Sequence, residues 1–468
     1  MKFINRKNEI KTLENEYNKS SSFVILYGRR RTGKTTLIKE FIKEKNAFYF
    51  FADKQNESLQ IERFKNQLAE HFKDELLRKI TISDWDTLFE YFINKIGEKK
   101  IIFIIDEFQY LCMVNKNFAS IFQRIYDEKL SNKNIMIILC GSLISMMYSE
   151  TLAYSSPLYG RRTTQIKLQP IKFQYYSEFF NNPSHKELIE FYSITSGVPK
   201  YILEFNREKT PLWNIENNIL NKDNFLYSEP KFLLQEEIND LSRYFSILHT
   251  ISSGSTKLST ICSQLGINSG GITPYITKLI DLDIVEKEVP VTENIDNGKK
   301  GLYKIKDNYL RFWFNYVYPY QSYLEIGNIS YPLEKIKNEF DLWVSKTYEE
   351  LARESLLNTD TIPFPIKKLG RWWDKNDEID IVGIGENEII FGECKWSVKK
   401  VGLSVLYDLK EKSKKVQWKN TSRKEYFILF SKEGFSDELI ELAKENNNII
   451  LSDFWILKKK STCQIDRY

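Results

Sequence analysis

The sequence predicts an α/β protein that begins with a parallel sheet covered by helices on both faces. Four runs in the first 200 residues are continuously apolar, as strands buried on both faces should be. Amphipathic stretches of helical period separate these runs. Because such alternation is typical of strands joined by crossover helices, we expect a doubly covered parallel sheet. The apolar runs are residues 23–27 (FVILY), 47–52 (AFYFFA), 101–105 (IIFII) and 135–140 (IMIILC), and the helical stretches are residues 35–45, 59–78, 85–96 and 119–130.

Length and composition set limits for the whole chain. At roughly 100–200 residues per domain, 468 residues correspond to about two to four folded units. The hydrophobic fraction of 42% is sufficient for packed cores and excludes wholesale disorder. The net charge of +5 is too small for a protein that coats DNA by charge alone.

Cysteine and histidine usage restricts the kinds of metal site. The five cysteines form no CxxC pair and the chain has only three histidines, so we expect neither a disulfide framework nor a zinc centre. Any metal should be a hard cation held by carboxylates. The best apolar run, residues 135–147, is shorter than the roughly 20 residues of a membrane helix, and Lys2 and Arg6 interrupt the N-terminus. We therefore expect a cytoplasmic protein without a secretory signal.

Changes of pattern along the chain predict five segments. The sheet and its helices occupy residues 1–168, and residues 169–235 lose the strand signal and form a helical lid. Three helical stretches and a hairpin at residues 236–310 predict a winged helix-turn-helix. An aromatic-rich linker at residues 311–334 leads to a last α/β domain at residues 335–468, which opens with a helix and continues with strands.

A phosphate-binding motif directly follows the first apolar run. Residues 28–35 (GRRRTGKT) fit GxxxxGK[ST] and lead into a helix, which is the context that a P-loop requires. The backbone amides of such a loop surround the β-phosphate, and the adjoining helix terminus favours negative charge. We therefore predict a P-loop NTPase fold, with Lys34 as a catalytic contact to the β- and γ-phosphates and Thr35 as a Mg²⁺ ligand. The candidate nucleotide-binding residues are Gly28, Arg29, Arg30, Arg31, Thr32, Gly33, Lys34, Thr35 and Thr36.

The third and fourth apolar runs end in polar residues suited to ATP hydrolysis. Asp106 and Glu107 follow IIFII in the Walker B pattern. Asp106 is expected to hold Mg²⁺, and Glu107 is the candidate base toward the attacking water. Ser142 follows IMIILC, where a polar sensor of the γ-phosphate is expected. No NKxD guanine-binding motif follows this run, so ATP is preferred over GTP.

Two arginines in the turn SPLYGRR are further candidates for the nucleotide site. Arg161 and Arg162 are suited to stabilising transition-state charge, either in their own site or in that of a neighbouring subunit. A solvated basic turn is the alternative interpretation.

The order of these motifs resembles the archaeal-type ATPases, which belong to the STAND branch of P-loop NTPases near the AAA+ proteins. The likeness covers about residues 1–310 and includes the opening segment FINRKNE, the Walker B segment DEFQYL, and the motifs CGS, YGRR and GVP. It implies that the opening Arg-x-x-Glu pair lies by the nucleotide, and that Pro199 in the Gly-x-Pro turn contacts the adenine from the lid. Leu143 stands where many relatives carry a second serine, a departure that affects only the sensor assignment.

Two predicted strands of the last domain carry carboxylates and a lysine. Period-two alternation places Asp380 on one face of its strand, and Glu393 and Lys395 on one face of the next. In an antiparallel pair these side chains would meet, and two carboxylates with a lysine suit Mg²⁺-dependent attack on a phosphodiester. The pattern resembles the PD-(D/E)xK restriction-endonuclease-like nucleases. This resemblance implies that Asp380 and Glu393 are metal ligands and that all three residues are catalytic.

Glu350, on the helix before these strands, is the predicted additional acidic ligand, and Glu349 is its neighbour. The motifs GRWWD at residues 370–374 and ECKW at residues 393–396 also resemble DUF234, a C-terminal domain often fused to archaeal-type ATPases. Together the resemblances cover nearly the whole chain.

The winged helix has two alternative roles: packing on the nucleotide domain and reporting its state, as the resemblance to STAND-type ATPases implies, or binding DNA. Residues 236–310 hold eight Lys/Arg and ten Asp/Glu, a net charge of −2, and Lys278 is the only basic residue of the predicted recognition helix. Since phosphate contacts dominate DNA affinity, packing is favoured.

We therefore predict a STAND-type ATPase switch that binds and hydrolyses ATP and is coupled to a Mg²⁺-dependent nuclease-like domain acting on nucleic acid. The alternative is a regulatory ATPase scaffold whose nuclease-like domain is inactive and only binds DNA or a protein partner. The expected cofactors are ATP and Mg²⁺. DNA is the expected partner of the last domain, and homo-oligomerisation is left open.

Overall fold

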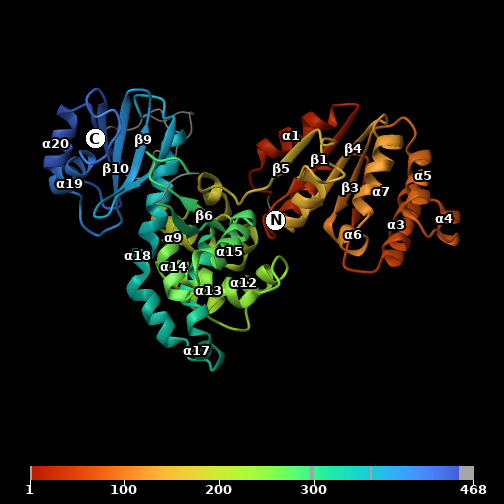
Figure 1. Ribbon diagram of the computed structural model, residues 1–468, viewed down its shortest axis with the longest axis horizontal. Helices are drawn as coiled ribbons and strands as arrows, with labels where there is room; N and C mark the ends of the chain where they lie inside the picture. The colour runs from red at the N-terminus through yellow and green to blue at the C-terminus, as the bar shows by residue number, and fades with distance from the viewer. Residues whose placement is uncertain (1–2, 296–299, 359–360, 453–468) are drawn as a thin grey trace. The chain divides into compact units, whose positions relative to one another are not determined.

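The structure is a computed structural model that describes residues 3–295, 300–358 and 361–452. The chain forms two compact units (Figure 1). The N-terminal unit comprises Met1–Ile171, Val198–Leu203 and Phe232–Asn239, and the C-terminal unit comprises Lys172–Gly197, Glu204–Lys231 and Asp240–Tyr468. Parts of three predicted segments lie outside the described residues: Lys2 of the N-terminus, residues 296–299 of the hairpin loop and residues 453–468 of the last domain.

The N-terminal unit contains a five-stranded sheet in the order β2-β3-β4-β1-β5, in which every neighbouring pair is parallel. The four apolar runs of the sequence are strands, as predicted, and the short β5 is a strand that the apolar pattern did not indicate. Because β4 lies between β1 and β3, the carboxyl ends of these three strands are adjacent. The strands are β1 (Ser21–Tyr27), β2 (Ala47–Phe51), β3 (Ile101–Asp106), β4 (Ile135–Gly141) and β5 (Thr164–Lys167).

Both faces of this sheet are buried, because alternate side chains of one strand enter different cores. Phe103 and Ile105 of β3 belong to an aromatic-rich core to which α3, α5 and α7 contribute. Ile102 and Ile104 belong to a second core, to which α1 and α2 contribute. The predicted parallel sheet with helices on both faces is therefore confirmed. The helices of this part are α1 (Lys7–Tyr17), α2 (Lys34–Phe41), α3 (Glu57–Phe72), α4 (Glu75–Lys79), α5 (Trp85–Ile96), α6 (Gln109–Val114), α7 (Phe118–Ile125) and α8 (Ile144–Met147).

The C-terminal unit contains the helices and the hairpin that the sequence predicts after the lid. Three helices precede an antiparallel pair, β6 and β7, which is the element order of the predicted winged helix. The predicted lid itself is divided, since Val198–Leu203 belongs to the N-terminal unit and the segments on either side of it do not. The elements are α9 (His185–Thr195), α10 (Pro199–Glu204), α11 (Pro211–Asn214), α12 (Phe225–Gln235), α13 (Leu241–Ser252), α14 (Leu258–Leu265), α15 (Ser269–Asp281), β6 (Val285–Glu288) and β7 (Leu302–Ile305).

Residues 311–316 of the aromatic segment predicted as a linker lie in a buried helix, so the prediction was wrong for this part. In α16 (Asn308–Tyr316) the Trp313 side chain is fully buried and donates Nε1–H to the Tyr227 carbonyl oxygen at 2.7 Å. The Tyr309 hydroxyl donates to the Leu226 carbonyl oxygen. Burial of several large aromatic side chains stabilises α16, and an exposed linker would lack this stabilisation.

The last part of the chain forms a separate mixed sheet in the order β12-β11-β10-β9-β8. The pairs β8–β9 and β9–β10 are antiparallel, and the pairs β10–β11 and β11–β12 are parallel. Within the described ranges, no helix is both long and apolar enough to span a bilayer. The elements are α17 (Gln321–Glu325), α18 (Ser330–Ser355), β8 (Lys368–Trp373), β9 (Glu378–Ile384), β10 (Glu388–Lys395), α19 (Leu403–Ser413), β11 (Lys424–Ser431), α20 (Asp437–Glu445) and β12 (Ile449–Ser452).

Candidate functional sites

The phosphate-binding loop between β1 and α2 depends on two glycines. Gly28 has a φ of 150°, and a Cβ at this position would overlap the carbonyl oxygen of Leu168. Gly33 has a φ of 93° and precedes α2 in the left-handed conformation. Because L-residues rarely adopt these angles, the loop requires glycine at both places, and Gly28 also lets it approach Leu168 closely.

Lys34 lies folded against this loop. Its side chain is buried, and Nζ donates hydrogen bonds to the carbonyl oxygens of Gly28 at 2.7 Å and Arg29 at 2.9 Å. Burial lowers the pKa of the ammonium group, and the charges of Glu107 and Asp106 act in the opposite direction. Two carbonyl oxygens therefore hold the Lys34 ammonium group, a cation that is suited to pair with phosphate oxygens.

Thr35 and Asp106, the two predicted Mg²⁺ ligands of the nucleotide site, are in contact. The Thr35 hydroxyl donates to Asp106 Oδ2 at 2.9 Å, and the Tyr49 hydroxyl donates to the same oxygen at 2.6 Å. Asp106 is almost fully buried. Burial of Tyr49 and the negative charge of Asp106 raise the pKa of the Tyr49 hydroxyl, which therefore stays protonated and donates. The sequence did not indicate a role for Tyr49, because it is one of several aromatic residues in the run AFYFFA.

Glu107 is held by residues from two other positions in the chain. The Ser142 hydroxyl donates to Glu107 Oε2 at 2.7 Å and the Ser142 N–H donates to it at 3.2 Å. The Gln109 amide donates to the same oxygen. Glu107 has a φ of 56°, an angle that a non-glycine residue adopts only when the surrounding structure imposes it. Gln109 was present in the motif DEFQYL but received no role from the sequence.

The opening segment and the Gly-x-Pro turn both lie at the P-loop. Arg6 is buried and donates Nη2–H to the Thr32 carbonyl oxygen at 2.9 Å, and it pairs with Glu9 at 3.2 Å. Burial lowers the pKa of the Arg6 guanidinium, and Glu9 opposes this change. Pro199 begins α10, and a Cβ on Gly33 would lie 4.0 Å from its Cγ.

The other predicted residues of the loop have different surroundings. Arg30 donates Nη2–H to the Tyr110 hydroxyl at 2.6 Å and lies 3.5 Å from Glu236, which also pairs with Lys54 at 2.9 Å. The side chain of Thr32 is buried and its hydroxyl donates to Arg29 O at 2.8 Å. Arg31 and Thr36 are exposed.

Arg161 and Arg162 are not brought to the P-loop. They precede β5, whose first residue pairs with Val24 in β1, whereas the P-loop follows the opposite end of β1. Arg161 is held by Asp127 through Nε at 2.9 Å and Nη2 at 2.8 Å. The Arg162 guanidinium lies 5.7 Å from the centre of the Tyr159 ring. A role in their own nucleotide site is therefore contradicted, and the role in a neighbouring subunit remains a prediction.

The predicted carboxylates and lysine of the last domain meet on β9 and β10. Asp380 and Glu393 are nearly buried, and the Cys394 N–H donates to Asp380 Oδ2 at 3.0 Å. Burial and the neighbouring charge of Glu393 raise the pKa of Asp380 to about 6. Lys395 Nζ donates to Glu393 Oε1 at 2.8 Å, and Lys412, which the sequence did not single out, lies 3.5 Å from Oε2. Two close, buried carboxylates form a site that a divalent cation would stabilise.

The structure contradicts the prediction of Glu350 as an additional metal ligand. Glu350 pairs with Lys304 at 3.4 Å and Arg311 at 3.5 Å. Burial raises the pKa of Glu350, but Lys304, Arg311 and Arg353 together outweigh burial and lower it. Burial and the charge of Asp380 instead raise the pKa of Glu349, its neighbour on α18, to about 8. No group of three His, Cys, Asp or Glu residues within the described ranges is arranged to hold a metal.

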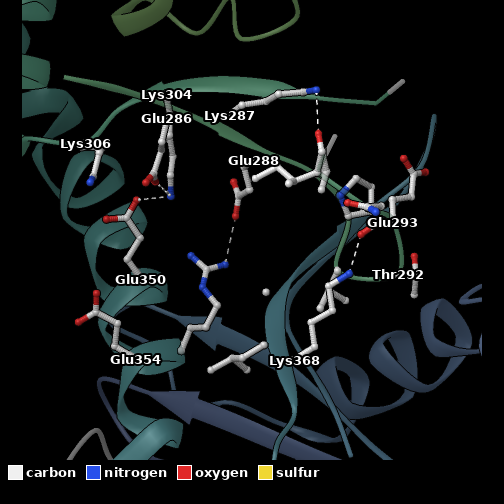
Figure 2. Close-up of a pocket in the computed structure, with 18 of the residues that line it drawn as sticks. Glu286, Lys287, Glu288, Thr292, Glu293, Lys304, Lys306, Glu350, Glu354 and Lys368 are labelled. Atoms are coloured by element: carbon white, nitrogen blue, oxygen red, sulfur yellow. Dashed lines mark hydrogen bonds and ion pairs between the residues drawn. The ribbon is translucent and has the colours of Figure 1, made fainter. Parts of the chain in front are cut away.

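A pocket of about 820 Å³ lies between the β6–β7 hairpin, α18 and β8 (Figure 2). Figure 2 shows Glu350 turned toward Lys304 at one end and Lys368 extended toward the hairpin loop at the other. The Val291 N–H donates to the Arg371 carbonyl oxygen at 2.8 Å, which joins the hairpin segment to β8. The hairpin is therefore packed against the last domain of its own unit.

From the hairpin, Glu288 connects this pocket to the carboxylate site. It lies 3.7 Å from Arg353 and 3.4 Å from Arg371. Arg353 in turn donates Nη1–H to the Asp380 carbonyl oxygen at 3.2 Å. Arg353 therefore both lines the pocket and contacts the backbone of Asp380, a candidate catalytic residue.

Two family models match the chain. Residues 3–205 match an ATPase domain predominantly from Archaea, and residues 313–415 match DUF234, which describes archaeal and bacterial proteins of unknown function. The uncharacterised protein MJECL04 of Methanocaldococcus jannaschii is 33% identical over 463 residues, which is 96% of this chain and 99% of that protein. The uncharacterised ATP-binding protein MJ0423 of the same organism is 52% identical over 44 residues, which is 9% of this chain and 75% of that protein.

Solved structures with a similar course of the chain include the Walker-type ATPase PABY2304 of Pyrococcus abyssi, with a TM-score of 0.48 and 20% identity over 67% of this chain and 96% of that chain. The STAND protein PH0952 of Pyrococcus horikoshii, with a tetratricopeptide repeat sensor, has a TM-score of 0.31 and 15% identity over 76% of this chain and 50% of that chain. At these scores neither likeness bears on the function of this chain.

Proposed function

Because the chain belongs to the family of ATPases, predominantly from Archaea, that carry a C-terminal DUF234 domain, we propose that it binds ATP with Mg²⁺ in the N-terminal unit and hydrolyses it. The observation that carries this proposal is the set of hydrogen bonds that joins Thr35 to Asp106 and Ser142 to Glu107. These residues follow β1, β3 and β4, whose carboxyl ends are adjacent. In open parallel sheets, ligands bind at this end of the strands.

Each residue of the set has one task in the proposed reaction. Lys34 exchanges the carbonyl oxygens of Gly28 and Arg29 for phosphate oxygens of ATP. Thr35 and Asp106 would hold Mg²⁺, which when bound neutralises charge that develops on the phosphates. Glu107 accepts the proton of the attacking water as the water oxygen bonds to the γ-phosphorus and the bond to ADP breaks.

The proposed ATPase is tested by Lys34→Ala. We expect ATP turnover to fall at least about 100-fold, because an oriented cation at the transferring phosphoryl group is lost. The matched control is Lys39→Ala, an exposed lysine on the same helix, which should retain wild-type turnover. Undiminished turnover by purified Lys34→Ala would contradict the assignment of the P-loop.

We also propose that the C-terminal unit is a Mg²⁺-dependent nuclease acting on DNA. Support comes from the contact of two β-strands at Asp380 and Glu393, with Lys395 paired to the carboxylate of Glu393. Asp380 and Glu393 are the residues that would hold Mg²⁺, and Lys395 would orient the attacking water. Asp380→Ala and Lys395→Ala should abolish Mg²⁺-dependent cleavage of single- or double-stranded DNA, whereas the exposed Lys400→Ala should not. Equal cleavage by all four proteins would remove the nuclease assignment.

An inactive binding domain is the second candidate for the same site. Lys395 and Lys412 each lie against one oxygen of Glu393, and this pairing neutralises a carboxylate that a metal would need. In that case wild-type protein retains DNA or a protein partner without cleaving DNA at any Mg²⁺ concentration. An electrophoretic mobility assay alongside the cleavage assay separates the two candidates.

A cytoplasmic location and self-association complete the proposal. Arg161 and Arg162 are distant from their own P-loop along β1, so we propose that they act in the nucleotide site of a neighbouring copy. Specific ATPase activity should then rise with protein concentration in the wild type and be independent of it in Arg162→Ala. A flat profile in the wild type would contradict action between copies.

A further inference from the structure

Gln109 is one of two residues that hold the carboxylate of Glu107. Ser142 donates twice, through its hydroxyl at 2.7 Å and its backbone N–H at 3.2 Å, and Gln109 donates through Nε2. All three bonds reach Oε2, and none of the three reaches Oε1. A carboxylate anchored through one oxygen presents the other in a fixed direction, which is the requirement for a general base.

The surroundings of Gln109 are unfavourable for a residue that only fills space. Its side chain is fully buried at the start of α6, and its Oε1 has no hydrogen-bond partner among the described residues. An unsatisfied buried polar atom destabilises the folded protein, and a leucine of similar size would avoid this loss. A buried amide beside a candidate catalytic carboxylate therefore indicates a role in the site.

The backbone on both sides is arranged to seat this side chain. The Phe108 N–H donates to the Cys140 carbonyl oxygen at 2.9 Å, which fixes the turn after β3 against the end of β4. Gly141 faces Gln109, and a Cβ on Gly141 would overlap Gln109 Oε1 and Met147 Sδ. The glycine of the motif CGS therefore leaves the space that Gln109 occupies.

We propose that Gln109 is a positioning residue for ATP hydrolysis, which orients Glu107 so that Oε1 meets the attacking water. The inference rests on the proposed ATPase function. Gln109 acts through Glu107 and has no contact of its own with ATP in this proposal. Its loss should therefore slow the hydrolytic step and leave nucleotide binding intact.

The experiment measures kcat, KM and the affinity for a fluorescent ATP analogue in the full-length protein. Gln109→Leu retains the size of the side chain and removes both polar groups, and Gln109→Glu retains size and polarity but removes the N–H donors. We expect kcat to fall about 10- to 100-fold in each variant, with analogue affinity within about twofold of the wild type. Gln60→Leu is the matched control, because Gln60 is also fully buried and also has an Oε1 without a partner in the described residues. The control should keep kcat within about twofold.

The outcomes separate a positioning role from a structural one. A folded Gln109→Leu or Gln109→Glu protein with wild-type kcat overturns the inference, and so does a loss of analogue affinity as large as the loss of kcat. Thermal melting identifies a variant that does not fold, and the other variant then decides. Absence of ATP turnover in the wild type would instead overturn the proposed ATPase.

Discussion

Adjacent glutamates on one helix have opposite environments in this protein. Glu349 and Glu350 are consecutive on α18, so their side chains point about 100° apart around the helix axis. Burial raises the pKa of Glu350, but the nearby cations, Lys304 and Arg311 among them, outweigh burial and lower the pKa. Burial and the charge of Asp380 instead raise the pKa of Glu349 to about 8. The identity of the residue does not decide its role here, because the direction of the side chain selects its partners.

Substitution of the two glutamates should separate stability from metal binding. Glu350→Gln removes one ion pair each from Lys304 and Arg311, so we expect a loss of about 1 kcal/mol in the free energy of unfolding and little change in Mg²⁺ affinity. Glu349→Gln should weaken Mg²⁺ binding and leave the unfolding free energy within about 0.5 kcal/mol. Chemical denaturation and Mg²⁺ titration by calorimetry measure the two quantities. Weaker Mg²⁺ binding in Glu350→Gln than in Glu349→Gln would contradict the expectation that Glu349, and not Glu350, affects Mg²⁺ binding.

At the scale of elements, the segment Phe232–Asn239 holds two loops of the nucleotide site. Glu236 pairs with Arg30 of the P-loop and with Lys54 after β2. Glu237 accepts hydrogen bonds from the Ile144 N–H at 2.8 Å and the Ser145 hydroxyl at 3.0 Å, at the start of α8. Because α8 begins two residues after Ser142, Glu237 supplies from a distant part of the chain the cap that the helix lacks locally.

Loss of this cap should be measurable as lower stability. Glu237→Ala leaves the first N–H of α8 without its acceptor, and we expect a decrease of about 1 kcal/mol in the free energy of unfolding. The control is Glu44→Ala, an exposed glutamate of the same unit, which should cost less than about 0.5 kcal/mol. Thermal melting of the three proteins decides. Equal midpoints for all three would show that the contact contributes nothing to stability.

For the whole molecule, the notable feature is the path of the chain between its two units. The chain passes from one unit to the other at residues 171/172, 197/198, 203/204, 231/232 and 239/240. The two short returns to the N-terminal unit are Val198–Leu203, which brings Pro199 to Gly33, and Phe232–Asn239, which brings Glu236 to Arg30. Segments next to the nucleotide site are therefore covalently continuous with the C-terminal unit on both sides.

A switch built on this path predicts a nucleotide-dependent change in those returns. ATP with Mg²⁺ should slow amide hydrogen exchange in residues 198–203 and 232–239 by at least about threefold, because binding to the folded site disfavours local opening. Lys34→Ala should remove the effect. Hydrogen-exchange mass spectrometry with and without nucleotide measures the exchange rates. Unchanged rates in the wild type would contradict the proposal that these segments respond to nucleotide binding.

The sequence by itself determined the features that depend on local chemistry. Continuous apolar runs specified the strands of the parallel sheet, since a strand buried on both faces tolerates few polar residues. Glycines, a lysine and a threonine at fixed spacing specified the P-loop, and carboxylates after a strand specified Asp106 and Glu107 as candidates. In the last domain, period-two alternation correctly brought Asp380, Glu393 and Lys395 together on two paired strands.

Only the tertiary structure decided which side chains meet across distant elements. Local pattern is the same for Glu349 and Glu350, and the choice between them depends on cations that lie about 40 residues away in the chain. Gln109, Tyr49 and Lys412 have no signature of their own, because their importance arises from a carboxylate on another element. The aromatic segment at residues 311–334 resembled a linker because burial of α16 requires partners from α12. Sequence spacing fixes what a residue can do, and packing fixes what it faces.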